Sequence, residues 1–173
     1  MNPQLSEAPL IGVDAIQQRT AELGRRISKD FAGDEIVVVT VLKGALIFAS
    51  DLIRHITAAQ RLEFIRARSY QGRRSSGAVQ ISVWPECPLR DQNVLVVEDI
   101  LDTRRTTAAI LDRLDAEQPA RLEYCALLDK PSRRERPLPP GYVGFTVEDH
   151  FVVGYGLDYE ERYRELDAVY TLE

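Results

Sequence analysis

The stretch VLVVEDILDTRRTT, residues 94–107, decides the fold class of this chain. It begins with the apolar run Val94–Val97, which is typical of a strand that is buried on both faces of a parallel sheet. Two carboxylates, Glu98 and Asp99, follow at once, and Asp102 lies in the polar segment before a helical pattern. Because ligands of α/β proteins bind beyond the carboxyl ends of the strands, the stretch predicts a parallel sheet with a binding site at its edge.

Strand and helix patterns alternate on both sides of this stretch. Apolar or alternating runs typical of strands occur at residues 36–42, 62–67, 79–83 and 122–128. Apolar residues at helical spacing occur at residues 16–31, 46–56 and from about 106. Asp14 with Gln17 is the pattern of a capping pair at the start of the first helix. The alternation predicts an α/β fold with a central, mainly parallel sheet flanked by helices.

Two stretches interrupt this alternation. Residues 69–77 (SYQGRRSSG) are small, polar and basic, and they lie between two predicted strands. Residues 130–141 contain four prolines and several arginines, and we interpret the arginines of residues 132–136 as a solvated loop. Both stretches are predicted as loops, and the first is a candidate for a mobile lid over a site.

The composition limits the class of protein. The chain has 173 residues, of which 45% are hydrophobic and 28% charged, as in an ordinary globular domain. No apolar run reaches the roughly 18 residues that span a bilayer, and the first residues lack the pattern of a secretory signal. Cys87 and Cys125 show no metal-binding spacing. We therefore expect a cytoplasmic protein of one domain, residues 1–173, with no membrane contact.

The net charge of −5 gives no basic footprint for nucleic acid, so we expect no nucleic-acid partner. A small phosphate site needs only local donors, and the start of the helix near residue 106 provides them as free amides. Thr103, Thr106 and Thr107 add hydroxyl donors. Glu98 and Asp99 would repel a phosphate beside them, but they suit ribose hydroxyls or a magnesium-bound diphosphate.

The blander interpretation of the acidic stretch is that Asp99 or Asp102 only caps the following helix. The complete string argues for more, because residues 94–107 resemble the ribose-phosphate signature of the type I phosphoribosyltransferases. Within them the string is similar to the hypoxanthine–guanine branch, which has strand-Glu-Asp-Ile-x-Asp-Thr-Gly-x-Thr. Other segments of that branch have counterparts in the same order, at residues 41–45, 68–70 with 75–77, 127–130 and 151–159. The matches run from about residue 36 to 164.

The resemblance implies the type I phosphoribosyltransferase fold, with a lid at about residues 69–77 and a purine-recognition hood at about residues 130–173. It implies transfer of a phosphoribosyl group from phosphoribosyl pyrophosphate to hypoxanthine or guanine, which gives IMP or GMP and pyrophosphate in purine salvage. Mg²⁺ is the implied cofactor, and Asp102 is the implied proton acceptor for the purine ring. The family also suggests a homodimer or a homotetramer.

The remaining roles come from the same resemblance. Phosphoribosyl contacts fall on Glu98, Asp99, Asp102, Thr103, Arg104, Arg105 and Thr106. The pyrophosphate loop falls on Leu42, Lys43 and Gly44, with Arg164 near it, and the Leu42–Lys43 peptide is often unusual in this family. The lid begins with Ser69 and Tyr70. Purine contacts fall on Lys130, Phe151, Val152 and Asp158, of which Lys130 would donate to the 6-oxo group and Phe151 would stack on the ring. The metal would meet Glu98, Asp99 and Asp158.

One position departs from the family pattern, because Arg104 stands where the signature has glycine. Glycine allows positive φ and a close approach of backbone amides to phosphate. We expect activity to be retained with altered affinity for the donor, since the other site positions match. Two alternatives stay open on sequence: a pyrimidine-operon RNA-binding regulator or uracil phosphoribosyltransferase of the same fold, and a weakly active relative that binds nucleotide.

Overall fold

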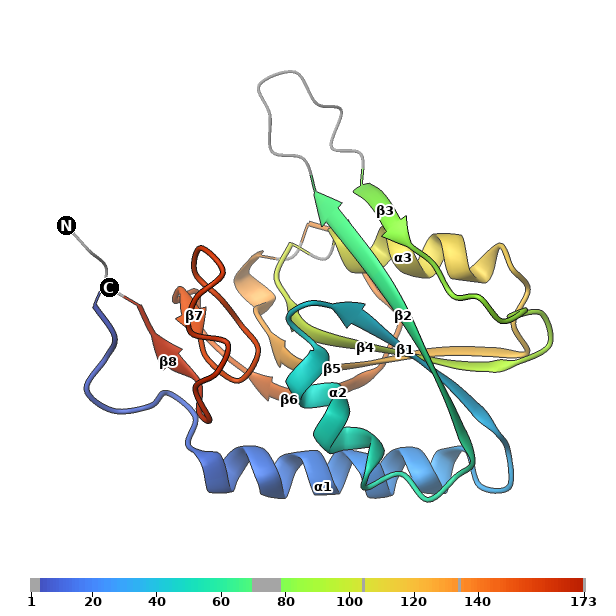
Figure 1. Ribbon diagram of the computed structural model, residues 1–173, viewed down its shortest axis with the longest axis horizontal. Coiled ribbons are helices and arrows are strands. Elements are labelled where there is room, and N and C mark those ends of the chain that lie inside the picture. Colours follow the sequence, from blue (N-terminus) through green and yellow to red (C-terminus); the bar gives the residue numbers. More distant parts are fainter. Residues whose placement is uncertain (1–3, 70–78, 104, 134, 173) are drawn as a thin grey trace.

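The computed structural model describes residues 4–69, 79–103, 105–133 and 135–172. The helices and strands in chain order are α1 (Val13–Asp30), β1 (Ile36–Leu42), α2 (Leu46–Ile53), β2 (Gln60–Ser69), β3 (Val79–Val83), β4 (Asn93–Leu101), α3 (Arg105–Asp115), β5 (Arg121–Asp129), the 3₁₀ turn η1 (Pro131–Arg133), β6 (Tyr142–Thr146), β7 (Val152–Val153) and β8 (Tyr170–Thr171). Figure 1 shows their arrangement. Tyr70 and Arg104, to which we assigned site roles, lie outside the described residues.

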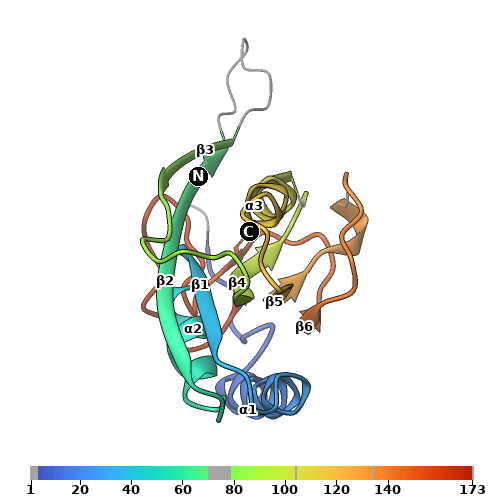
Figure 2. The same ribbon diagram turned by 90° about the vertical axis from the view of Figure 1, so that its right-hand side faces the viewer.

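A six-stranded sheet in the order β3-β2-β1-β4-β5-β6 forms the centre of the molecule. Within this sheet, neighbouring strands from β2 to β6 pair in parallel, whereas β2 and β3 pair antiparallel. Helices α1 and α2 lie on one face of this sheet and α3 lies on the other (Figures 1 and 2). The predicted α/β fold with a mainly parallel sheet flanked by helices is confirmed.

Apolar residues of the central strands explain why both faces are covered. Val38 and Leu95 pack with α1 and α2 in one core, whereas Val39 and Val96 pack with α3 in the other. Alternate residues of a strand point to opposite faces, so a continuous valine-rich run fills two cores at once. None of the helices within the described residues combines the length and apolarity needed to cross a bilayer.

The connections after β1 and β4 run in opposite directions along the sheet. The chain leaves β1 through α2 to β2, whereas it leaves β4 through α3 to β5 on the other side. Between β1 and β4 the pairing runs from Ile36 opposite Asn93 to Thr40 opposite Val97, and it stops there. The two strands therefore separate where the strand order reverses, which is where open α/β sheets bind ligands.

A second, two-stranded sheet of β7 and β8 lies beside the main one, toward the two chain ends. Backbone bridges join Leu5 to Leu172 and Ile11 to Val169, so the first described residues run along the last ones. This arrangement fixes the C-terminal segment, which supplies part of the site.

Three local expectations were wrong in detail. Helix α1 begins after Gly12 without a side-chain cap, so Asp14 and Gln17 form no capping pair. Strand β4 does not end at Val97 but continues to Leu101, because β5 still pairs with it beyond that point. The apolar spacing of residues 46–56, which begins with Leu46, predicted that residue on the buried face of α2, but Leu46 is exposed and Phe48 is buried instead.

Candidate active site

A polar cavity of about 340 Å³ lies where β1 and β4 separate. The loop after β1, the end of β4 and the start of α3 form most of its wall, and the C-terminal segment closes it. The residues that line it are Val41, Leu42, Lys43, Gly44, Ala67, Glu98, Asp99, Ile100, Asp102, Thr103, Thr106, Thr107, Arg133, Asp158 and Arg164. The structure thus brings together the residues expected at the pyrophosphate loop and most of those expected at the phosphoribosyl site.

Glu98 and Asp99 reach opposite sides of the sheet because they are successive residues of β4. Glu98 is 5% exposed, and its Oε1 accepts a hydrogen bond from Thr107 Oγ1 of α3 at 3.2 Å. Its Oε2 is buried and has no hydrogen-bond partner among the described residues. Burial raises the pKa of Glu98 well above its usual range, and the nearby Asp99 carboxylate raises it further.

Asp99 faces the loop after β1. Its Oδ1 accepts the backbone N–H of Ile100 at 2.9 Å. Burial raises the pKa of Asp99 from 3.8 to about 6, although that N–H bond favours the charged form. The site thus holds two neighbouring carboxylates that are poorly solvated, an arrangement that favours a bound cation or hydroxyl donors.

The loop after β1 lies in direct contact with Asp99. A Cβ placed on Gly44 would lie 1.6 Å from Asp99 Oδ2, so a larger residue there requires the Asp99 side chain or the loop to shift. Gly156, whose φ is +100°, lies against the carbonyl of Gly44, where a Cβ would be 2.1 Å from that oxygen. The Leu42–Lys43 peptide bond is cis. Three segments that are distant in sequence therefore meet at the centre of the site, where the backbone of Gly44 touches the backbone of Gly156 and the side chain of Asp99.

The start of α3 forms the end of the cavity that suits a phosphate. Thr103, Thr106 and Thr107 line it, and the free amides of the first helical turn favour an anion there. Arg105 does not line the cavity, because its guanidinium forms an ion pair with Glu135 on the surface. Of the two arginines expected beside the phosphate, the structure thus turns Arg105 away.

A second cavity of about 510 Å³ adjoins the first. Its lining residues are Asp99, Ile100, Asp102, Lys130, Arg133, Asp149, Phe151, Val152, Leu157 and Asp158. Five of these residues also line the first cavity: Asp99, Ile100, Asp102, Arg133 and Asp158. The residues that we expected to bind a purine are therefore brought together, next to the acidic residues.

Lys130 and Phe151 differ sharply in burial. Lys130 is 6% exposed, and its Nζ donates a hydrogen bond to the His150 carbonyl, which fixes the ammonium at the cavity wall. Phe151 is 53% exposed, although it packs edge-on against Tyr159 with 5.7 Å between the ring centres. An exposed aromatic face in a cavity is available for stacking, whereas a core phenylalanine is not.

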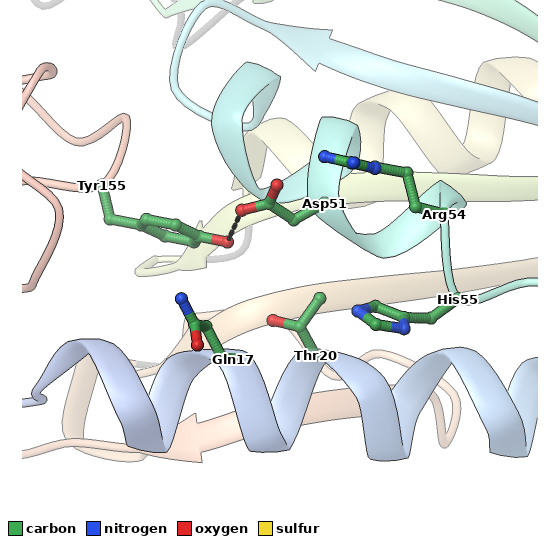
Figure 3. Close-up of a pocket in the computed structure, with 6 residues that line it drawn as sticks. All are labelled: Gln17, Thr20, Asp51, Arg54, His55 and Tyr155. Carbon is green, nitrogen blue, oxygen red and sulfur yellow. Dashed lines mark hydrogen bonds between the residues drawn. The ribbon is translucent and has the colours of Figure 1, made fainter.

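The loop of residues 154–158 carries Leu157 and Asp158 into the site. Gly154, Tyr155 and Gly156 all have positive φ values, of 96°, 50° and 100°. The Tyr155 hydroxyl donates to Asp51 Oδ2 of α2 at 2.7 Å, within a separate pocket of about 460 Å³ between α1 and α2 (Figure 3). This hydrogen bond connects the loop to the helix that follows the pyrophosphate loop.

Asp158 and Arg164 form an ion pair on the wall of the first cavity. Arg164 Nη2 lies 2.8 Å from Asp158 Oδ1, and Arg164 Nη1 donates to the Gly156 carbonyl at 2.7 Å. The buried Arg164 Nε has no hydrogen-bond partner among the described residues. The arginine is thus fixed in place with one donor still free.

Arg133 is a site residue that sequence reasoning missed, because residues 132–136 were interpreted as a solvated loop. Its side chain lines both cavities. Its Nε lies 2.9 Å from Asp102 Oδ1, and its Nη1 lies 3.4 Å from Asp149 Oδ1. The Asp102 carboxylate raises the pKa of the Arg133 guanidinium above its already high value. The basic run after Lys130 was a signal, but nothing in it distinguished Arg133 from its neighbouring arginines.

Asp102 stands between the two cavities. Its ion pair with Arg133 lacks hydrogen-bond geometry, and its buried Oδ1 accepts no hydrogen bond from the described residues.

Ser69 is the last residue of β2, at the base of the segment expected to form the lid. No group of three or more His, Cys, Asp or Glu in the part of the chain that the structure describes is arranged to hold a metal ion unaided.

Residues 12–160 match the family model for the phosphoribosyl transferase domain. The hypoxanthine-guanine phosphoribosyltransferase of Mycobacterium avium is 40% identical over 171 residues, which cover 95% of this chain and 84% of that protein. The hypoxanthine phosphoribosyltransferase of Escherichia coli is 40% identical over 157 residues, which cover 89% of this chain and 88% of that protein.

Solved structures agree with these relatives. A hypoxanthine-guanine phosphoribosyltransferase from Bacillus anthracis, with a HEPES molecule in its active site, superposes with a TM-score of 0.92 at 39% identity and covers 99% of each chain. A hypoxanthine phosphoribosyltransferase from Staphylococcus aureus gives a TM-score of 0.92 at 40% identity, over 96% of this chain and 91% of that one.

Proposed function

The chain belongs to the phosphoribosyltransferase family, in its hypoxanthine–guanine branch, and from this premise we propose that it is an enzyme of purine salvage. It transfers the 5-phosphoribosyl group of phosphoribosyl pyrophosphate to hypoxanthine or guanine, giving IMP or GMP and pyrophosphate. The observation that carries this proposal is the pair of adjoining cavities, which share Asp99, Asp102 and Asp158. One accepts a phosphorylated sugar and the other a flat base.

The base end of the site supports a 6-oxopurine. Lys130 is a donor without acceptor capacity, so it suits the 6-oxo oxygen of hypoxanthine or guanine and not the exocyclic amine of adenine. The exposed ring of Phe151 provides a stacking surface for the base. Val152 and Leu157 form the apolar wall of this cavity. Lys130 therefore sets the choice of base, and Phe151 sets its plane.

The end of the site that would bind the phosphoribosyl donor suits a sugar that carries a phosphate and a diphosphate. The start of α3 and the hydroxyls of Thr103 and Thr106 hold the 5-phosphate. Lys43, the Gly44 backbone and Arg164 hold the diphosphate. Arg104 lies in this part of the chain, and it alters donor affinity without abolishing activity.

In the reaction a ring nitrogen of the purine forms a bond to the anomeric carbon, and the bond from that carbon to the pyrophosphate oxygen breaks. The purine loses a ring proton in the process, and the carboxylate of Asp102, which lines both cavities, accepts it. Arg133 holds the Asp102 side chain beside the base. Lys43 and Arg164 stabilise the charge that develops on the leaving diphosphate.

Magnesium fits this set of residues, because Mg²⁺ is bound by one or two carboxylates together with phosphate oxygens and water. Asp99, Asp158 and the buried, incompletely paired Glu98 would hold it together with the substrate. The ion supplies neutralising charge for the diphosphate when bound. The absence of a ready-made cluster of three ligands among the described residues agrees with a metal that enters with its substrate.

The remaining parts of the proposal concern the whole chain. Residues 1–173 form one domain, in which residues 130–173 form a purine-recognition hood, and the enzyme works in the cytoplasm. The lid expected at residues 69–77 lies, after Ser69, outside the described residues. It assembles as a homodimer or homotetramer. The exposed apolar residues Leu46 and Ile47 of α2, with Leu62 and Phe64 of β2, support self-association. Sedimentation velocity measures the assembly.

The decisive assay incubates the protein with phosphoribosyl pyrophosphate, Mg²⁺ and one of five bases: hypoxanthine, guanine, xanthine, adenine or uracil. Chromatography of the nucleotides should show IMP and GMP, no product from adenine or uracil, and loss of product when EDTA removes the metal. No product from any base would refute the enzyme. Conversion of uracil alone would instead favour the pyrimidine-specific relatives.

A further inference from the structure

Glu161 forms a bridge between the two cations of the pyrophosphate end of the site. Its Oε2 lies 2.8 Å from Lys43 Nζ and 3.1 Å from Arg164 Nη2. These contacts lower the pKa of Glu161 to about 2, chiefly through the hydrogen bond from Lys43. Lys43 and Arg164 line the first cavity, whereas Glu161 does not. A carboxylate from outside the cavity therefore neutralises the groups that a diphosphate requires.

The backbone holds Glu161 in this place. Residues 159–162 form a tight turn in which Tyr159 and Arg162 exchange backbone hydrogen bonds of 3.2 and 3.0 Å. The two central residues, Glu160 and Glu161, have φ values of 50° and 65°. Such turns favour Asn-Gly, because side chains with a Cβ are strained at positive φ. The Glu161 N–H also donates to Asp158 Oδ2 at 2.9 Å, which fixes the turn to the site.

Arg164 does not depend on Glu161 for its position. Asp158 Oδ1 and the Gly156 carbonyl also hold its guanidinium, at 2.8 and 2.7 Å. Lys43 differs, because Glu161 is the partner that holds its ammonium in the described part of the chain. The Lys43 and Glu161 side chains are 47% and 59% exposed, so solvent weakens their ion pair and either partner can move away.

We propose that Glu161 is an internal competitor of the diphosphate: it occupies Lys43 and Arg164 in the empty site and is displaced when the donor or pyrophosphate binds. This inference rests on the proposed function and adds to it a residue that sets the affinity for the leaving group. By occupying these cations, Glu161 weakens pyrophosphate binding and so eases release of that product. Glu161 lowers the affinity of the site for pyrophosphate only a few-fold, because exposed ion pairs are weak.

The test compares Glu161→Gln with Glu160→Gln. Both substitutions remove one charge from neighbouring, exposed positions of the same turn with similar φ values, but only Glu161 contacts Lys43 and Arg164. Titration calorimetry with inorganic pyrophosphate and Mg²⁺ measures the dissociation constant of the parent and of each variant. Steady-state assays measure KM for phosphoribosyl pyrophosphate and product inhibition by pyrophosphate.

Glu161→Gln should bind pyrophosphate about 2- to 5-fold more tightly than Glu160→Gln does. It should also lower KM for the donor and strengthen product inhibition, and the difference should shrink in about 0.5 M KCl. Equal affinities of the two variants, or weaker binding by Glu161→Gln, would overturn the inference while IMP formation by the parent upholds the proposed function. A parent that forms no IMP and binds no pyrophosphate would overturn both.

Discussion

At the scale of single residues, Lys130 is the group on which we propose that the choice of base depends. Its ammonium is buried and already fixed by the His150 carbonyl, so it loses little freedom when a 6-oxo group arrives. A hydrogen bond from a charged group contributes about 1.5–3 kcal/mol. We predict that Lys130→Gln lowers kcat/KM for hypoxanthine by roughly 10- to 100-fold, measured at saturating donor. Lys29→Gln, at the exposed end of α1, is the matched control and should leave the value unchanged. A loss below twofold in Lys130→Gln would remove Lys130 from base recognition.

Substitution of Gly44 tests the close contact between the pyrophosphate loop and Asp99 of the acidic pair. An added methyl group would meet Asp99 Oδ2 at 1.6 Å, so either the loop or the carboxylate must move. Overpacking of this kind costs about 1–3 kcal/mol of stability. We predict that Gly44→Ala lowers kcat/KM for the donor at least about tenfold, since misplacement by an ångström has such effects. Gly12→Ala introduces the same methyl group where nothing lies within 4 Å, and it should retain full activity. Retained activity in Gly44→Ala would show that the contact is dispensable.

At the scale of elements, the loop of residues 154–158 is held to α2 by Tyr155. Removal of its hydroxyl leaves the Asp51 carboxylate without this donor, at a cost of about 1–3 kcal/mol. We predict that Tyr155→Phe loses stability in urea unfolding and also raises KM for donor and base, because the loop carries Leu157 and Asp158 into the site.

Tyr142→Phe is the matched control for this prediction. Tyr142 is also buried, and its hydroxyl donates to the Asp30 carboxylate at 2.9 Å, between β6 and α1 and outside the lining of both site cavities. Both variants should lose similar free energy of unfolding, but only Tyr155→Phe should alter KM. Unaltered KM in both would mean that the loop keeps its place without the Tyr155 hydroxyl.

The helices and strands could be predicted from the sequence where the local pattern of apolar and β-branched residues is clear. Strand β1 begins and ends at the predicted residues, because a β-branched run between a polar segment and Lys43 has no competing interpretation. Strand β6 was not predicted, since residues 142–146 follow a proline-rich loop and include Gly144. That glycine lies against the Leu127 carbonyl, where a Cβ would be 2.4 Å away, so tertiary packing and not local propensity selects it.

At the scale of the whole molecule, the site depends on the reversal of strand order between β1 and β4. The sequence predicted which segments carry candidate site residues, because each segment has its own motif, and most of those residues line the two cavities. It did not predict their mutual contacts. The approach of Gly156 to Gly44 and the ion pair between Arg133 and Asp102 join segments far apart in the chain. Such contacts follow from packing in three dimensions, which periodicity does not encode.

The fold also accommodates Glu98 and Asp99 at a cost in stability, and this cost should depend on pH. The pKa of Asp99 is raised from 3.8 to about 6, so the folded state binds its proton more tightly than the unfolded chain does. The contribution of Asp99 to stability is therefore present below pH 3.8, is lost as pH rises from there to about 6, and is constant above. Without metal, Asp99→Asn should be more stable than the parent by roughly 1–3 kcal/mol at pH 7.5.

That advantage of Asp99→Asn should shrink as the pH falls from about 6 toward 4. Asparagine keeps an oxygen for the Ile100 N–H, so the comparison isolates the charge. Urea unfolding in EDTA at several pH values measures both proteins, and Asp34→Asn, in the exposed turn before β1, controls for the loss of one negative charge. If the difference between parent and Asp99→Asn stayed constant across this range, the carboxylate would not be desolvated in the folded protein. Because the unfavourable burial exists before any ligand arrives, a bound cation or sugar hydroxyl relieves it, which ties the stability of the fold to occupation of its site.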